Sequence, residues 1–304
     1  MEKIVIAGGS GFLGQVLENH FKDQYQIKVL TRNPVRENDI YWDARAIGKW
    51  VKALENCKAL INLAGKSVDC RYTGKNRKSI YDSRMDSTRI LGEAINQCEN
   101  PPEIWINSST ATIYRHSLDK EMTEEKGEIG NGFSMGIARS WEGTFNNIKN
   151  PETRKILIRT SIVMGKNGGA FIPLRKLTKL GLGGKQGSGN QKVSFIHEYD
   201  FARAVGFLIN NGQLKGVFNL TVPKPTDNKT LMRSLRKVMK IPFGIDHPVW
   251  LLRLGAKIIG TETELVLKSR NVIPQRLLDN GFRFGYADIG EVVASLGKPD
   301  KIHP

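Results

Sequence analysis

The chain has 304 residues, of which 39% are hydrophobic and 25% charged, so it can bury a sizeable core and is neither disordered nor fibrous. No apolar run approaches the roughly 18 residues that span a bilayer, and the amino-terminal segment is not typical of a signal peptide. The three cysteines have a spacing that fits neither a disulfide framework nor a zinc site. We therefore expect a soluble, cytoplasmic protein without a membrane partner or a metal. The net charge of +16 is compatible with nucleotide or nucleic-acid ligands, but the densest basic stretch, residues 71–78, carries no nucleic-acid-binding signature, so we expect a solvated surface there and no nucleic-acid partner.

Short apolar runs alternate with helical patterns along the first half of the chain. A β-branched run at residues 3–7 precedes a glycine-rich segment, and apolar residues at helical spacing follow up to Phe21. Further strands are predicted at residues 27–30, 59–63, 104–106 and 156–158, and helices at residues 87–98 and 136–148. This alternation predicts an α/β fold with a doubly wound parallel sheet of the Rossmann type.

The alternation stops near residue 165. Glycines at 168–169 and 181–189 predict loops, a helical pattern returns at 200–209, and Pro223-Lys224-Pro225 precedes a helix-rich carboxy-terminal region. We therefore predict a Rossmann domain of residues 1–165 with a return segment at about 198–220. A smaller substrate-binding lobe is predicted from residues 166–197 and 221–304.

The glycine segment has the spacing of a dinucleotide-binding loop. Gly8 would allow the tight turn, Gly11 would let a pyrophosphate approach the backbone, and Gly14 would permit close packing of helix and strand. Because the segment follows a predicted strand and opens a predicted helix, we expect it to bind a cofactor through these glycines and the residues between them, Ser10, Phe12 and Leu13. The alternative is a glycine turn that only joins strand to helix.

The end of the second predicted strand bears on the choice of cofactor. Where an NAD site would place an acidic residue on the ribose, the sequence has Thr31 followed by Arg32. An arginine can neutralise a 2′-phosphate that a carboxylate would repel, so we expect NADP, with NADPH preferred over NADH. Alternatively, Arg32 is one more surface cation of a basic protein.

Further motifs along the chain resemble those of one superfamily. They are Trp42-Asp43, Asn62-Leu63-Ala64-Gly65, Asp82-Ser83-Arg84, Trp141-Glu142, Gly181-Leu182-Gly183-Gly184, Ser194-Phe195-Ile196-His197 and Val272-Ile273-Pro274. With them the chain resembles the extended and atypical short-chain dehydrogenase/reductases, in particular an epimerase-like bacterial branch of the NAD-dependent epimerase/dehydratase family with a carboxy-terminal domain of unknown function. The resemblance implies a cleft between the two lobes that holds nicotinamide and substrate.

The resemblance also implies cofactor contacts outside the glycine loop. It places Asp43 near the adenine, and Leu63, Ala64 and Gly65 along the cofactor at the end of a strand. Arg84 completes the expected cofactor site. For Asp43 the alternative is a turn or cap residue, which is a common role for aspartate after a strand.

The catalytic residues of the superfamily are present only in part. In that superfamily a Ser or Thr orients the substrate and a Tyr transfers the proton. A Lys four residues after the Tyr lowers the pKa of its phenol for this step. Thr110 falls at the hydroxyl position, but alignment on Glu142 puts Ser134 and Ala138 at the positions of Tyr and Lys. Tyr114, Lys166 and His197 are the candidates for the missing groups. Packing is the alternative role for Tyr114, and a hydrogen bond in the interface between the lobes is the alternative for His197.

These observations favour an NADP-dependent oxidoreductase or epimerase that acts by hydride transfer on a small polar, sugar-like substrate. Thr110 and Tyr114 are the expected catalytic residues. The rival is a non-catalytic NADP(H) sensor, which the missing Tyr and Lys favour. The helices predicted at 87–98 and 136–148 are the first candidates for a homodimer interface, with simple core packing as the alternative.

Overall fold

The structure, a computed structural model, describes residues 1–259 and 262–298 and contains a seven-stranded parallel β-sheet. The strand order across this sheet is β10-β6-β5-β4-β1-β2-β3. The strands are β1 (Lys3–Ala7), β2 (Gln26–Thr31), β3 (Asp39–Tyr41), β4 (Cys57–Asn62), β5 (Ile104–Thr110), β6 (Arg154–Thr160) and β10 (Gly216–Leu220). The order reverses between β1 and β4, which is where ligands bind in open sheets of this type.

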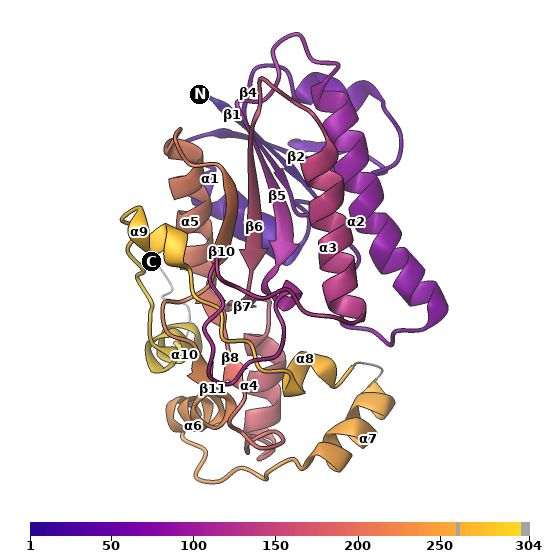
Figure 1. The fold of residues 1–304 in the computed structure, drawn as a ribbon. Coiled ribbons are helices and arrows are strands. Elements are labelled where there is room, and N and C mark those ends of the chain that lie inside the picture. Colours follow the sequence, from indigo (N-terminus) through magenta and orange to yellow (C-terminus); the bar gives the residue numbers. More distant parts are fainter. Residues whose placement is uncertain (260–261, 299–304) are drawn as a thin grey trace.

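Helices cover both faces of the sheet. On one face lie α1 (Phe12–Phe21) and α5 (Glu198–Asn210), and on the other α2 (Gly74–Ile95) and α3 (Phe133–Asn147) (Figure 1). The predicted doubly wound Rossmann fold is therefore confirmed.

The central strands are apolar throughout because both of their faces are covered. In β1, Ile4 and Ile6 pack in the core on the side of α1 and α5, whereas Val5 and Ala7 pack in the core on the side of α2 and α3. All four residues are fully buried. Successive side chains alternate between the faces of a strand, so a strand covered on both sides reads as an unbroken apolar run.

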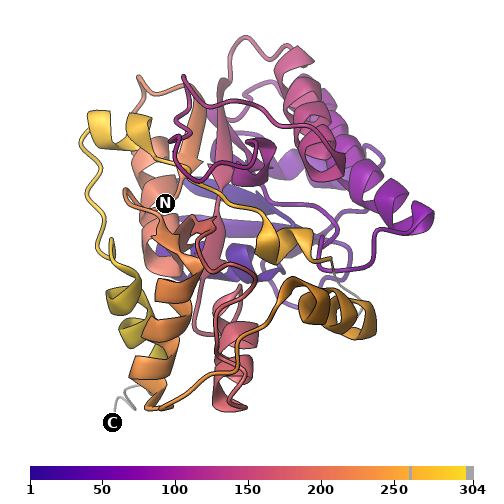
Figure 2. The same cartoon turned by 60° about the horizontal axis from the view of Figure 1, so that its bottom comes forward.

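A smaller lobe lies beyond the carboxyl ends of the strands and comes forward in Figure 2. Its helices α4, α6 and α10 share a third hydrophobic core, which includes Phe171, Leu231 and Val292. Two short strand pairs, β7 with β9 and β8 with β11, connect the lobe to the end of the sheet. The elements are β7 (Ile162–Met164), α4 (Phe171–Lys179), β8 (Lys192–Val193), β9 (Phe195–His197), β11 (Thr226–Asp227), α6 (Asn228–Met239), α7 (Val249–Ile259), α8 (Glu264–Leu267), α9 (Gln275–Asp279) and α10 (Ile289–Gly297). Short 3₁₀ turns occur at Lys49–Ala53 and Ala111–Ile113.

The carboxy-terminal segment does not stay within the smaller lobe. Leu277 of α9 and Phe282 pack in the same core as α1 and α5 of the Rossmann domain. The guanidinium of Arg276 lies 4.0 Å from the centre of the Phe218 ring of β10 and donates to the carbonyl of Val217 at 2.7 Å. Residues 275–284 thus bind the edge of the sheet, whereas the sequence prediction assigned them to the substrate lobe.

Helix α2 is longer than the sequence predicted. The predicted helix began at residue 87, but α2 begins at Gly74, and the side chain of Thr73 caps it by accepting from the backbone N–H of Asn76. The first turns are polar and mostly solvated, so they lack the apolar spacing on which the prediction depended. The short edge strand β3 and helix α4 were also missed.

None of the described helices is long and apolar enough to cross a membrane.

Candidate functional site

The glycine turn between β1 and α1 is fixed by backbone geometry. Gly8 has φ of +76°, and a Cβ there would lie 2.9 Å from the Cα of Ala64. A Cβ on Gly14 would lie 2.3 Å from both the Cα and the carbonyl oxygen of Gly9. The first glycine is therefore needed for the turn and the third for the approach of α1 to β1, as the sequence predicted.

The middle glycine leaves room for a ligand. A Cβ on Gly11 would meet only the carbonyl oxygen of Gly8, at 3.6 Å. Gly11 is the N-cap of α1, and no side chain caps this helix end. The amino terminus of α1 can therefore receive an anion such as a pyrophosphate.

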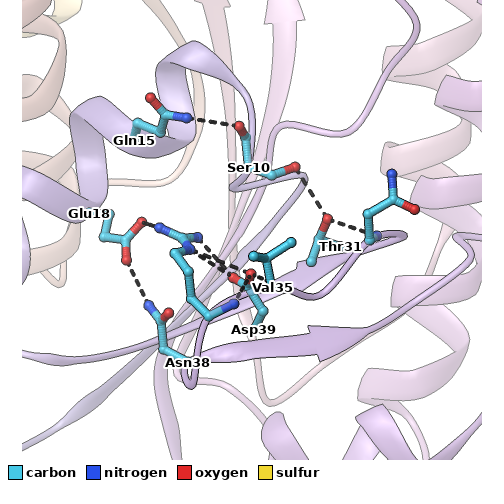
Figure 3. A network of polar contacts seen from close by, with 9 residues as sticks. Ser10, Gln15, Glu18, Thr31, Val35, Asn38 and Asp39 are labelled. Atoms are coloured by element: carbon cyan, nitrogen blue, oxygen red, sulfur yellow. Dashed lines mark hydrogen bonds and ion pairs between the residues drawn. The ribbon is translucent and has the colours of Figure 1, made fainter.

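Side chains next to the turn hold it against β2. The Thr31 hydroxyl donates to the Ser10 hydroxyl at 3.2 Å, and the Gln15 amide donates to the Ser10 carbonyl at 3.1 Å (Figure 3). These contacts connect the glycine turn to the end of the strand where the cofactor choice was predicted.

A cavity of about 910 Å³ opens beside this turn. It brings together most of the residues predicted to bind the cofactor, namely Gly8, Ser10, Gly11, Thr31, Arg32, Asp43, Leu63, Ala64 and Gly65. We refer to it as the nucleotide cavity. Phe12, Leu13 and Arg84 line a second cavity instead, while Gly14 lines neither and serves the packing of α1.

Two arginines after β2 have different environments. Arg36 is held by Glu18 at 2.6 Å and Asp39 at 2.8 Å, two carboxylates labelled in Figure 3, and does not line the nucleotide cavity. Arg32 is exposed, lines the cavity, and has no ion-pair or hydrogen-bond partner within residues 1–259 and 262–298. Arg32 is therefore the arginine of this loop that is free to meet a ligand anion.

Asp43 forms the turn that was the alternative to its predicted place near the adenine. One carboxylate oxygen accepts from the backbone N–H groups of Arg45 and Ala46, at 2.9 and 3.1 Å, and these bonds lower the pKa of Asp43. The side chain thus stabilises a turn, and Asp43 also lines the nucleotide cavity, so its place near the adenine stays a prediction.

The second cavity, of about 530 Å³, lies at the carboxyl ends of β4, β5 and β6. It shares Leu63, Gly65 and Ser67 with the nucleotide cavity, so the two adjoin along the end of β4. We call it the substrate cavity. Thr110, at the end of β5, lines it, and its hydroxyl lies 2.6 Å from that of Thr112 and accepts from the Thr112 backbone N–H at 3.2 Å.

Tyr114, the other expected catalytic residue, lies away from both cavities. Its side chain is fully buried, its hydroxyl donates to Asn219 at 3.0 Å, and Arg159 donates to it at 2.8 Å. Arg159 also forms a buried ion pair with Glu142 at 2.7 Å, and Ser109 donates to the same carboxylate at 2.6 Å. This placement assigns Tyr114 to a polar network beneath the site and argues against the expected role in proton transfer.

The remaining replacement candidates also lie outside the two cavities. His197 accepts from the Tyr199 backbone N–H, which caps α5, and stacks on Tyr286 with ring centres 4.0 Å apart. Burial lowers the pKa of His197 to about 4. Lys166 lines neither cavity, and its backbone N–H donates to Glu198 at 3.0 Å.

The helix that carries Tyr and Lys in the superfamily presents other groups here. Ser134 lines the substrate cavity and donates to Glu264 at 3.4 Å, while Ala138 is fully buried and does not reach the cavity. Helix α3 thus contributes the Ser134 hydroxyl to this cavity and contains neither a tyrosine nor a lysine.

Two residues of the substrate cavity were missed by the sequence prediction. Tyr72, from the loop before α2, lines the cavity; burial raises the pKa of its phenol, and a hydrogen-bonding interaction with Ser134 partly opposes this. Arg270, from the segment after α8, also lines it and is nine-tenths buried. No local motif marks either residue, because both reach the site only through the tertiary fold.

Comparison with known proteins agrees with this geometry. The family described as "NAD dependent epimerase/dehydratase family" matches residues 4–221, and "Domain of unknown function (DUF1731)" matches residues 247–296. An epimerase family protein of Staphylococcus aureus (strain N315), SA0724, is 31% identical over 303 residues, covering 98% of this chain and all of that protein. Another from Bacillus subtilis (strain 168), YfhF, is 30% identical over 301 residues, covering 96% of this chain and 97% of that protein.

Solved structures show the same fold. The human epimerase family protein SDR39U1, solved with NADPH, superposes with a TM-score of 0.88 at 24% identity over 97% of this chain and 99% of that chain. A nucleoside-diphosphate sugar epimerase from Corynebacterium glutamicum gives a TM-score of 0.79 at 24% identity, covering 97% of this chain and 58% of that chain.

Proposed function

Because this chain belongs to the NAD-dependent epimerase/dehydratase family, we propose that it is an NADP(H)-dependent oxidoreductase or epimerase that transfers hydride to or from a small polar, sugar-like substrate. The observation that carries the proposal is the junction of the two cavities. The nucleotide cavity contains the glycine turn, and the substrate cavity contains Thr110 and adjoins it at Leu63 and Gly65. A dinucleotide that begins at Arg32 would extend along the end of β4 toward Thr110.

The preference for NADP over NAD is supported by the residues that directly follow β2. Arg32 lines the nucleotide cavity without a partner among the described residues, and Arg45 lines it as well. No acidic side chain follows β2 directly, since Arg32 and Asn33 occupy those positions. A 2′-phosphate at the end of β2 would thus meet Arg32, with Arg45 in the loop after β3. The human structure solved with NADPH is consistent with this choice.

The chain's own residues account for the other parts of a hydride-transfer reaction. Bound nicotinamide would supply or accept the hydride. A carbonyl that receives hydride becomes an alkoxide and needs a proton. Tyr72 offers a phenol for this, which is protonated at neutral pH at its ordinary pKa and whose pKa burial raises further. Thr110, held by Thr112, would orient the substrate oxygen. We assign proton donation to Tyr72 in place of the Tyr that the superfamily carries at the position of Ser134.

A turnover assay with a panel of aldehydes, ketones and hydroxy sugars tests the proposal. The NADPH signal is followed with each compound, and the products are also analysed for inverted stereocentres, because an epimerase returns the hydride to its own substrate. Conversion by the wild-type protein, reduced in Thr110→Val, supports the proposal. Tight NADPH binding without conversion of any compound would contradict it and favour the sensor, for which Ser134 and Ala138 at the usual catalytic positions are the specific observation.

A further inference from the structure

The substrate cavity contains a buried guanidinium that the protein pairs only weakly and that keeps two donor atoms without a partner. Arg270 is 9% exposed, and its Nε and Nη1 atoms have no hydrogen-bond partner. Its Nη2 lies 4.0 Å from the carboxylate of Glu264, which is the limit of an ion pair. Glu264 is nearer to Lys268, whose ammonium group lies at 2.9 Å. Donor atoms of a buried guanidinium that lack hydrogen-bond partners lower the stability of the folded protein. Their presence at this position therefore indicates a role in binding a ligand.

The backbone around Arg270 is held rigidly. The Arg270 N–H donates to the Lys192 carbonyl of β8 at 2.8 Å, and the Arg270 carbonyl accepts from the Ser194 hydroxyl at 2.8 Å. The neighbouring Ser269 hydroxyl donates to the Ser117 carbonyl. The segment that carries the guanidinium is thus held by hydrogen bonds both to the region of β8 and to the loop at Ser117, as expected of a preorganised ligand contact.

A second guanidinium reinforces the positive charge of the cavity. Arg84 of α2 lines the same cavity, and burial lowers its pKa to about 10. Its Nη1 donates to the carbonyls of Lys66 and Ile80, its charge lies over the Trp141 ring at 5.1 Å, and no carboxylate pairs with it within residues 1–259 and 262–298. Apart from these arginines the cavity is lined largely by apolar and hydroxyl side chains. Its chemistry therefore fits a compact ligand with one anionic group.

We propose that the substrate carries an oxyanion group, a carboxylate or a phosphate monoester, and that Arg270 binds this group while the reacting carbon lies near Thr110. The placement of the reacting carbon near Thr110 rests on the proposed function. Binding of the anion by Arg270 does not, because that contact needs only the substrate cavity. Pairing with a substrate anion would satisfy the Arg270 donors that the protein leaves free. Arg270 is then a specificity-determining residue from outside the matched Rossmann segment.

Binding of small carbonyl probes tests this directly. Pyruvate is compared with its neutral amide, and dihydroxyacetone phosphate with dihydroxyacetone, by thermal shift and calorimetry, with and without NADP. We expect one charged probe to bind at least about 10-fold more tightly than its neutral counterpart, because hydrogen bonds to charged groups contribute at this level. The pair that shows the difference identifies the anion as carboxylate or phosphate.

Variants then locate the contact. Arg270→Met should abolish the preference for the charged probe, and Arg270→Lys should retain part of it. Arg233→Gln, on the exposed side of α6, is the matched control and should bind like the wild type. Arg270→Met should also fold with equal or higher thermal stability, since it removes an unsatisfied buried charge. A merely structural arginine would instead destabilise the protein when replaced.

The outcomes separate this inference from the proposed function. If neither charged probe is preferred, or the preference survives in Arg270→Met, the anion site is refuted even when NADPH binds. If NADPH fails to bind but Arg270-dependent anion binding persists, the cofactor proposal fails and the anion site stands.

Discussion

Replacing Arg32 tests the link between the charge after β2 and the choice of cofactor. Arg32 lines the nucleotide cavity and has no protein partner among the described residues, so Arg32→Ala should remove a ligand contact and leave the fold intact. Arg32→Glu adds repulsion of a 2′-phosphate and should weaken NADPH binding further.

The size of the effect follows from the exposure of Arg32. At a separation of about 4 Å, unit charges interact by about 1 kcal/mol in water and about 4 kcal/mol near a protein surface. Charge-assisted hydrogen bonds contribute about 1.5–3 kcal/mol. Because Arg32 is exposed, we take the range of about 1–2 kcal/mol, which weakens NADPH binding roughly 5- to 30-fold in Arg32→Ala.

Isothermal calorimetry with NADPH and NADH measures the effect at two salt concentrations. NADH affinity should stay within about 2-fold, and the loss for NADPH should shrink as ionic strength rises, because exposed charges are screened. Arg36→Ala is the control: its side chain is held by Glu18 and Asp39 outside the cavity, so both affinities should be unchanged. Equal weakening of NADPH and NADH in Arg32→Ala would refute the assignment of Arg32 to the 2′-phosphate.

Three further predictions concern the substrate cavity and its support. Tyr72→Phe should lower kcat about 100-fold or more without changing NADPH affinity, because it removes only the proton donor; an unchanged kcat in steady-state assays would exclude Tyr72. Glu142→Gln leaves the charge of the buried Arg159 unpaired and should lower the free energy of unfolding by about 3–5 kcal/mol. Urea titrations measure this change, and a loss below about 1 kcal/mol would mean that solvent reaches the Arg159 guanidinium and compensates its charge. Burial lowers the pKa of His197 to about 4 in the folded protein, from 6.5 for an exposed histidine. Between pH 6.5 and pH 4 the unfolded chain therefore binds more protons at this residue than the folded protein does, so the stability falls as the pH falls. His197→Asn can keep the cap of α5 without titrating and should flatten that dependence in thermal melts, and an equally steep curve in the variant would assign it to other groups.

The nucleotide half of the site could be predicted from the sequence because short-range geometry determines it. Gly8 needs its positive φ and Gly14 its close contact with Gly9 whatever the rest of the chain does. The apolar strand β1 and the loop that follows it therefore specify the turn, and with it the amino terminus of α1. The same is true of Arg32, which follows directly from the end of β2.

The substrate half could not be predicted in the same way. The position of Tyr114 just after β5 favoured a catalytic role. Its hydroxyl instead donates a hydrogen bond within the core to Asn219, which lies 105 residues further along the chain. Arg270 reaches the cavity because Lys192 of β8 and Ser194, which lies between β8 and β9, form hydrogen bonds with its backbone. Tyr72 precedes the polar first turns of α2, which the apolar pattern did not reveal. Such contacts depend on tertiary packing, which a single sequence does not display.

Titration of the cofactor-stripped protein with NADPH and NADH is the measurement on which all the proposed steps depend, because each of them needs the nucleotide cavity to bind the cofactor. We expect saturable binding of NADPH with one site per chain and clearly weaker binding of NADH. Failure of both nucleotides to bind, in protein shown to be folded, would contradict the assignment of the glycine turn and the cavity beside it.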